Sequence, residues 1–271
     1  MSEESNLDAY LKRINYAGSI APNLATLEML HRLHPAAIPF ENLNPLMELP
    51  VRLQLSDLVQ KLVVERRGGY CFEHNLLFKA VLEAMDFTVT GLAAGVLWGR
   101  TDPSPPQQLT HMALLVDVGG VPYLADVGFG GQVMTAPLRL RDGVEQETPN
   151  GRYRLSGGDP VWVLEAEIAD SWRPLYRFDL TPRTLDDYVA LNDVTMGMFK
   201  DMLMAARSEG RRRHALLNTR YNLHDEATTT TRTLGSVAEL RDILSGPFAI
   251  TLPETDKLDT ALARVLAGAN P

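Results

Sequence analysis

Cys71 is the only cysteine in this chain of 271 residues, and it stands where a glycine turn meets a helical pattern. The stretch "RGGYC" ends at Cys71, and apolar residues at helix-like spacing follow it. A cysteine at a helix N-terminus lies near the positive end of the helix dipole and near unpaired N–H groups, which both favour thiolate over thiol. The glycines let the chain turn sharply and leave the sulfur uncovered. Cys71 is therefore a candidate nucleophile.

A predicted β-hairpin brings an imidazole and a carboxylate together. Two apolar runs flank the Gly119–Gly120 pair within the segment 111–131, which is the pattern of a two-residue hairpin turn. In the resulting register Asp126 lies opposite Ala113, and His111 is two residues away on the same face of the sheet. Such diagonal neighbours have Cα atoms roughly 7–8 Å apart, within reach of long side chains. A slip of one position would separate them.

These three residue types together form a nucleophile, a base and an orienter, as in Cys-His-Asp catalysis. The alternatives are an inert buried thiol and a strand histidine that has no role in catalysis. Cys71, His74 and His111 could also be imagined as zinc ligands. However, the first two form only a weak i, i+3 pair, the chain has no second cysteine, and structural zinc usually takes four ligands. We therefore expect no metal, and we expect His74 to hydrogen-bond within its helix or to pack.

Composition narrows the class of protein. Hydrophobic residues make up 45% and charged residues 22% of the chain, which is ordinary for a globular protein. The formal net charge of −8 argues against a general nucleic-acid binder but leaves room for a local basic pocket. A single cysteine excludes an internal disulfide. The polar start "MSEESNLDAY" lacks a signal core, and no run approaches the roughly 20 apolar residues of a membrane span. We expect a cytoplasmic enzyme or binding protein without membrane contact.

Helical periodicity fills the first third of the chain, and short strand-like runs follow Asp86. A mixed pattern begins near Leu191, so the chain is predicted to be an α+β protein in three segments. The segments are 1–86, 87–190 and 191–271.

Smaller features give further expectations. Ser56 and Ser236 are expected to cap helices, and the glycines of "RGG" to end the first of these. "TTTTRT" is expected to be an edge strand or loop, "HALLNTRYNLHD" to be strand-like, and "RRRH" (211–214) to be a solvated turn. The stretch "VTMGMFKDMLMAA" is expected to be helical, and its methionine-rich part to be core or a flexible lid. His31 and His34 are expected on the surface.

The motifs around these residues resemble the arylamine N-acetyltransferase family. "RGGYC" matches the nucleophile motif of that family, and His111 and "DVGFG" (126–130) match its other two triad positions. "PFEN" (39–42) matches the signature of its helical domain, and "HALLN" lies where family members carry a similar segment. The similarity runs over most of the chain and is strongest from Pro39 to Gly131.

The resemblance implies a fold and a set of ligands. The fold would be α+β, with an N-terminal helical bundle, a central β-barrel and a C-terminal α/β lid around a catalytic core like that of cysteine proteases. Acetyl-CoA would be the co-substrate, and small aromatic amines or hydrazines the acceptors, as in xenobiotic metabolism. The protein would be a monomer or a small homo-oligomer.

The resemblance also implies roles for individual residues. Phe40, Phe129 and Phe199 would bind the acceptor, Thr110 and Gly130 would contact the coenzyme, and Glu41 and Arg67 would form a buried ion pair that supports the cysteine loop. In "RRRH", a role in holding coenzyme phosphates is the alternative to a solvated turn. Asp86 stands where glycine is frequent in the family, and Asp tolerates the left-handed conformation better than most residues.

The implied reaction is a ping-pong acetyl transfer through an acetylated Cys71. His111 would hold the thiolate as an ion pair and later take a proton from the amine, and Asp126 would orient the imidazole. Two other functions stay open from the residues alone. The same triad serves cysteine hydrolases and transglutaminases, and a non-catalytic coenzyme-binding module could keep the fold.

Overall fold

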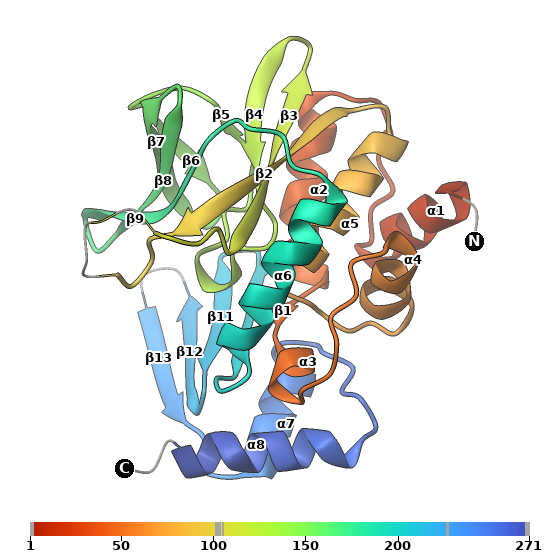
Figure 1. The fold of residues 1–271 in the computed structure, drawn as a ribbon, viewed down its shortest axis with the longest axis vertical. Coiled ribbons are helices and arrows are strands. Elements are labelled where there is room, and N and C mark those ends of the chain that lie inside the picture. The colour runs from red at the N-terminus through yellow and green to blue at the C-terminus, as the bar shows by residue number, and fades with distance from the viewer. Residues whose placement is uncertain (1–2, 101–103, 105, 226–227, 269–271) are drawn as a thin grey trace.

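The computed structural model of the chain describes residues 3–100, 104, 106–225 and 228–268. The predicted first and third segments therefore extend beyond the described ranges at both ends of the chain. Figure 1 shows helices grouped on one side of the molecule, a strongly curved sheet beside them, and a smaller sheet with two helices at the C-terminal end.

Helices dominate the chain as far as Ala84, as the periodicity predicts. Asn23 begins the second helix, because its side-chain oxygen accepts a hydrogen bond from the Thr26 N–H at 3.0 Å. The helices of this region are α1 (Glu3–Arg13), α2 (Leu24–Ala37), α3 (Leu43–Leu46), α4 (Leu55–Leu58), the π-helix η1 (Val59–Val64) and α5 (Cys71–Ala84).

Two expectations for this region are wrong. Ser56 does not cap its helix, since α4 begins one residue earlier, at Leu55, and the chain then widens into η1. His31 and His34 are fully buried rather than exposed. They lie on the face of α2 that packs into the protein, where both ring nitrogens of His34 and Nε2 of His31 have hydrogen-bond partners. The expected left-handed conformation of Asp86 is confirmed by its φ of 62°.

Eight antiparallel strands form one sheet in the order β5-β4-β3-β2-β9-β8-β7-β6. Its two edge strands are tied by Gln146, whose side chain hydrogen-bonds the Arg139 N–H at 2.8 Å and the Arg139 C=O at 2.9 Å. The sheet is thereby nearly closed into the expected barrel (Figure 1). Its strands are β2 (Thr88–Val96), β3 (His111–Val118), β4 (Val121–Ala125), β5 (Leu138–Arg139), β6 (Glu145–Thr148), β7 (Gly151–Gly158), β8 (Val161–Ile168) and β9 (Ser171–Phe178).

A second sheet has the order β1-β10-β11-β12-β13, and its first strand, β1 (Phe40–Glu41), comes from the helical part of the chain. "TTTTRT" forms the edge strand β13, and Ser236 caps α7, both as expected. The remaining elements are η2 (Gly130–Gln132), α6 (Leu185–Phe199), β10 (Met204–Glu209), β11 (Arg212–Leu217), β12 (Arg220–Asp225), β13 (Thr228–Thr233), α7 (Val237–Ser245) and α8 (Asp256–Gly268).

These bounds correct parts of the prediction for the third segment, residues 191–271. The methionine-rich stretch is helical only up to Phe199, and strand β10 begins at Met204. "RRRH" is a turn only at its start, because β11 begins at Arg212, and His214 is buried against the Tyr221 hydroxyl at 2.8 Å. Helix α6 spans the predicted boundary between residues 190 and 191.

Candidate active site

The loop before Cys71 is shaped by close approach rather than by left-handed glycines. The residue with positive φ is Arg66, at 56°, and neither Gly68 nor Gly69 has a positive φ. A Cβ on Gly68 would lie 2.0 Å from the Pro39 carbonyl oxygen, and one on Gly69 would lie 2.6 Å from a Glu73 carboxylate oxygen. The two glycines therefore let the loop pack against β1 and against the first turn of α5, which a side chain would prevent.

Cys71 is the first residue of α5, as the sequence predicts. The Glu73 carboxylate accepts a hydrogen bond from the Tyr70 N–H at 3.0 Å and so caps this end of the helix. Lys61, at the centre of η1, lies 2.7 Å from the same carboxylate and compensates its buried charge. Burial raises the pKa of Glu73, although Lys61 acts against this shift. The nucleophile helix is thus fixed at its N-terminus by a buried ion pair.

The expected Glu41–Arg67 pair is formed in the interior. Arg67 donates to one Glu41 oxygen from Nε at 3.0 Å and from Nη2 at 2.7 Å, and the Leu43 N–H donates to the other oxygen at 2.6 Å. Burial alone would raise the pKa of Glu41, but Arg67, Lys61 and the Leu43 N–H lower it to about 2. The pair therefore joins the RGG loop to β1, the strand that carries Phe40.

The hairpin between β3 and β4 has the predicted register. Leu114 pairs with Ala125 across the turn, and both glycines of the turn have positive φ, 63° and 82°. Asp126 follows directly after β4, and His111 is the first residue of β3. His111 Nε2 lies 2.6 Å from Asp126 Oδ2, so the predicted contact is confirmed.

The other oxygen of Asp126 is held by two donors. Asn75 Nδ2 lies 2.9 Å from Oδ1 and also donates to the Met112 carbonyl at 2.8 Å, while the Gly128 N–H donates to Oδ1 at 2.8 Å. Asn75 Oδ1 accepts from the Val127 N–H at 3.1 Å. Our sequence analysis missed Asn75, although its position four residues after Cys71, on the same face of the helix, was a usable signal.

The surroundings of His111 and Asp126 favour the charged forms of both side chains. Burial alone would lower the pKa of His111, but the Asp126 carboxylate and the contact with the Cys71 sulfur raise it. Burial alone would raise the pKa of Asp126, but His111, Asn75 and the Gly128 N–H lower it. Because Asp126 occupies Nε2 of His111, Nδ1 is the ring nitrogen left for Cys71. Cys71 Sγ also lies 3.6 Å from the Thr110 carbonyl oxygen.

Aromatic side chains surround this group. Phe129 packs edge-on to His111 with ring centroids 5.0 Å apart, and Phe40 packs edge-on to Phe199 at 6.5 Å. Gly130, with φ of 70°, brings the backbone near the Phe40 ring, which would lie 3.6 Å from a Cβ at this position. The structure therefore brings all three predicted phenylalanines and Gly130 to the region of Cys71 and His111. Tyr176, which our sequence analysis did not select, packs 4.8 Å from the His111 ring.

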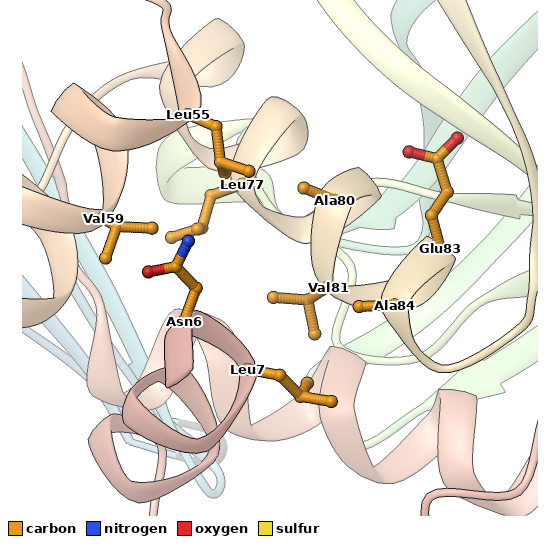
Figure 2. A pocket seen from close by; sticks show the side chains of 9 residues that line it. All are labelled: Asn6, Leu7, Leu55, Val59, Leu77, Ala80, Val81, Glu83 and Ala84. Carbon is orange, nitrogen blue, oxygen red and sulfur yellow. The ribbon is translucent and has the colours of Figure 1, made fainter. Parts of the chain in front are cut away.

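Two cavities in the part of the chain that the structure describes differ in position, since one lies away from this region and the other borders it. One of them, of about 270 Å³, lies in the helical part among α1, α4, η1 and α5 (Figure 2). Its wall is mostly aliphatic and holds none of the three candidate catalytic residues. A far smaller cavity, about 10 Å³, is lined by Phe40, Gly130 and Ser208, among others.

Metal-ligand clusters and membrane-spanning helices are both absent from the described ranges. Among residues 3–100, 104, 106–225 and 228–268, no three His, Cys, Asp or Glu side chains are arranged as metal ligands would be. His74 points to the carbonyl oxygens of Pro39 and Gly69, at 3.2 and 3.0 Å, and not to a partner within its own helix. In the same part of the chain, no helix has the length and apolar character needed to cross a bilayer.

Comparison with known proteins assigns the chain to a family. A family model described as N-acetyltransferase matches residues 23–257. The arylamine N-acetyltransferase of Mycolicibacterium smegmatis is 38% identical over 91% of this chain and 92% of its own length. That of Escherichia coli is 43% identical over 69% of this chain and 66% of its own length. The solved arylamine N-acetyltransferase structure from Mycobacterium marinum superposes with a TM-score of 0.90 at 37% identity, over 96% of this chain and 99% of that one. The predicted fold is thereby confirmed, and the chain belongs to the arylamine N-acetyltransferase family, whose members are acyltransferases.

Proposed function

We propose that this enzyme moves the acetyl group of acetyl-CoA to the nitrogen of an arylamine or arylhydrazine through an acetyl-cysteine at Cys71. The observation that carries the proposal is the position of Cys71 at the N-terminus of α5, in contact with a His111 ring that Asp126 holds at 2.6 Å. The relatives named above support the acceptor class by their names. A Mycobacterium marinum structure described as a complex with CoA, with a TM-score of 0.89 and 38% identity, supports the donor.

In the first half-reaction Cys71 acts as a thiolate paired with the His111 imidazolium. Its sulfur forms a bond to the acetyl carbon, the thioester C–S bond breaks, and the thiolate of CoA leaves with the proton from His111. In the second half-reaction neutral His111 takes a proton from the amine while the amine nitrogen bonds the acetyl carbon. The bond from this carbon to Cys71 then breaks, which restores the thiolate–imidazolium pair.

Asp126 has two roles in this scheme. It fixes the ring of His111 with Nδ1 toward the sulfur, and its charge stabilises the imidazolium. Negative charge that develops on the acetyl oxygen would be stabilised by backbone N–H groups near Cys71, which the N-terminus of α5 supplies.

The residues on the Gly130 side fit a coenzyme that carries phosphates. Arg213 donates from Nη1 to Gln132 of η2 at 3.0 Å, and its Nε has no hydrogen-bond partner in the part of the chain that the structure describes. The same holds for the buried Ser208 hydroxyl beside the small cavity. We propose that Thr110 and Gly130 contact the acetyl-bearing end of the coenzyme and that Arg213 binds a phosphate.

Phe40, Phe129 and Phe199 would form the apolar wall that binds the aromatic acceptor and excludes water. Water exclusion is what separates a transferase from a hydrolase with the same triad, because the acetyl-cysteine must survive until an amine arrives. The predicted division into three segments, cytoplasmic location and monomeric or small oligomeric state stay predictions, as does the predicted absence of nucleic-acid partners.

The test is CoA release measured by rapid mixing with acetyl-CoA and no amine. We expect a burst of about one equivalent followed by a slow phase, an acetyl adduct on Cys71 by mass spectrometry, and fast turnover when an arylamine is added. Cys71→Ser should lose the burst and the turnover. Fast steady release without amine would instead indicate a hydrolase. Coenzyme binding without a Cys71 adduct would indicate a non-catalytic module.

A further inference from the structure

Helix α2 carries two buried histidines that the proposed chemistry does not use. His31 and His34 are one turn apart, and neither has any exposed surface. The His31 ring contacts the loop that carries Asp126, whereas the His34 ring contacts His74, which lies beside the turn before Cys71. Both rings pack edge-on to Phe78 of α5, with centroids 5.9 and 5.5 Å away, so α2 and α5 are in direct contact here (Figure 1).

His34 lies in a chain of hydrogen bonds that ends at the nucleophile loop. The Tyr10 hydroxyl is 2.8 Å from His34 Nδ1, and His34 Nε2 is 2.8 Å from His74 Nδ1. His74 Nε2 lies 3.0 Å from the Gly69 carbonyl oxygen and 3.2 Å from that of Pro39. The chain therefore connects α1, α2 and α5 to a carbonyl two residues before Cys71.

The donors and acceptors in this chain of hydrogen bonds can be assigned in only one way. Carbonyl oxygens only accept, so His74 must carry its proton on Nε2 and accept at Nδ1. His34 must then donate from Nε2 and accept at Nδ1 from Tyr10. Burial lowers the pKa of His74 to about 4 and that of His34 well below its ordinary value, which keeps both rings neutral as the chain requires. Arg13 faces His34 and adds to its lowering, and Lys61 and Glu41 face His74 with opposite effects.

His31 contacts the loop that carries Asp126. Its Nε2 accepts a hydrogen bond from the Asp126 backbone N–H at 3.0 Å. Asp126 follows the last residue of β4, beyond the residues that pair with β3. His31 therefore accepts the hydrogen bond that a neighbouring strand would otherwise accept. The acceptor role requires a neutral ring, and burial lowers the pKa of His31 to about 4, although nearby Asp126 acts against this shift.

We propose that His31 and His34 are positioning residues through which α2 sets the placement of Cys71 relative to Asp126. One imidazole fixes the backbone of the carboxylate loop, and the other, through His74, fixes the turn before the nucleophile. The two loops share this one helix as their support, so a change in either histidine alters the triad geometry without contact with substrate. The inference rests on the proposed function of Cys71, His111 and Asp126.

The test compares His31→Gln with His31→Asn in the full-length enzyme. A glutamine oxygen can occupy the position of Nε2 and accept from the Asp126 N–H, whereas the shorter asparagine reaches only the position of Nδ1. We expect His31→Asn to lower kcat about 10- to 100-fold with KM for acetyl-CoA within twofold, because a buried N–H loses its partner. His31→Gln should restore most of kcat. His34→Leu, which breaks the other chain, should lower kcat similarly.

A second readout separates positioning from a merely structural role. The rate of Cys71 alkylation by iodoacetamide, followed against pH, reports how well His111 and Asp126 hold the thiolate. In His31→Asn and His34→Leu this profile should shift toward that of a free thiol. Thr26→Val, also a buried change on α2, removes a 3.4 Å hydrogen bond to the Ser19 carbonyl that lies apart from both loops. It should leave kcat and the profile unchanged.

Three outcomes are informative. If His31→Asn and His31→Gln have equal kcat and the native alkylation profile, and differ from the native enzyme only in melting temperature, the positioning role is wrong. If His31→Asn loses kcat but His31→Gln does not regain it, the acceptor argument is wrong. If the native enzyme itself alkylates like a free thiol and shows no burst, the proposed function fails and not merely this inference.

Discussion

His111 Nε2 and Asp126 Oδ2 lie 2.6 Å apart at the end of the β3–β4 hairpin, with both side chains almost fully buried. This contact leaves Nδ1 of His111 to face Cys71. The opposite oxygen of Asp126 is already held by the Asn75 amide and the Gly128 N–H, at 2.9 and 2.8 Å. The carboxylate is therefore held in one orientation, in which Oδ2 contacts His111 and Oδ1 accepts from Asn75 and Gly128.

This arrangement predicts the effect of Asp126→Asn. The amide oxygen should take the place of Oδ1, where two donors require an acceptor, and the NH₂ group would then face His111 Nε2. His111 would have to accept at Nε2 and carry its proton on Nδ1, so neither an imidazolium nor the correct tautomer is available to Cys71. We expect kcat to fall by about 10⁴, the size of the equivalent change in a serine triad.

The measurement is single-turnover acetylation of Cys71, with circular dichroism and thermal unfolding as checks on the fold. Because both hydrogen bonds to the replaced Oδ1 can be kept, the melting temperature should change little compared with the loss of rate. Turnover within tenfold of the native value would show that Asp126 has only a structural role.

The hairpin register was predictable because it depends on local features. The Gly119–Gly120 turn defines the pairing of the strands that flank it, and side-chain alternation then puts His111 and Asp126 on one face. The Cys71 position was predictable for the same reason, since a loop and the start of the helix that follows it are contiguous in sequence.

The buried residues that support the site could not be predicted from local features of the sequence. His31 and His34 resemble ordinary polar residues on an amphipathic helix, and their partners Asp126 and His74 are 95 and 40 residues away. Histidine is found both inside and outside proteins, so residue type alone gave no reason to bury them. Lys61 was missed as well, because it contacts Glu73 from η1, a π-helix that the helical periodicity of the sequence did not indicate.

Gly128→Ala should damage the site by steric conflict alone. Its φ is not in the left-handed region, so backbone conformation does not forbid alanine. However, the added Cβ would lie 2.9 Å from the Cys71 Cα and 3.0 Å from Asn75 Nδ2. The first atom belongs to the backbone, and the second, although it ends a side chain, is held by its hydrogen bonds to the Met112 carbonyl and to Asp126 Oδ1. We expect a loss of about 1–3 kcal/mol in the free energy of unfolding and a lower kcat at temperatures where the variant is folded.

Gly197→Ala is the matched control for that change. Gly197 lies in the exposed part of α6, where an added Cβ would meet no described atom within 4 Å, and alanine should raise stability by about 0.5–1 kcal/mol. Urea unfolding and steady-state rates of both variants check the comparison. Equal behaviour of the two alanines would show that the loop after Asp126 can move away from Cys71 at little cost.

The buried histidines predict that the fold weakens in mild acid. Burial lowers the pKa of His31 and of His74 to about 4, whereas an unfolded histidine has a pKa of about 6.5. Between these values the unfolded chain binds more protons than the folded one, so stability falls as pH decreases from about 6.5 toward 4. The raised pKa of His111 contributes little slope well below pH 6.5, because this ring is then protonated in both states.

His31→Gln isolates one of these contributions. Removing a group whose pKa falls from about 6.5 to about 4 on folding should make the loss of unfolding free energy between pH 6.5 and pH 5 smaller by about 1.5 kcal/mol. Glu73, whose pKa is raised by burial, opposes the acid effect in both proteins and cancels in the difference. Urea unfolding of the native and variant enzymes at the two pH values provides the measurement. An identical pH dependence in the two proteins would mean that His31 takes up a proton as readily in the fold as in the unfolded chain, which would contradict a buried ring held neutral by its hydrogen bond from the Asp126 N–H.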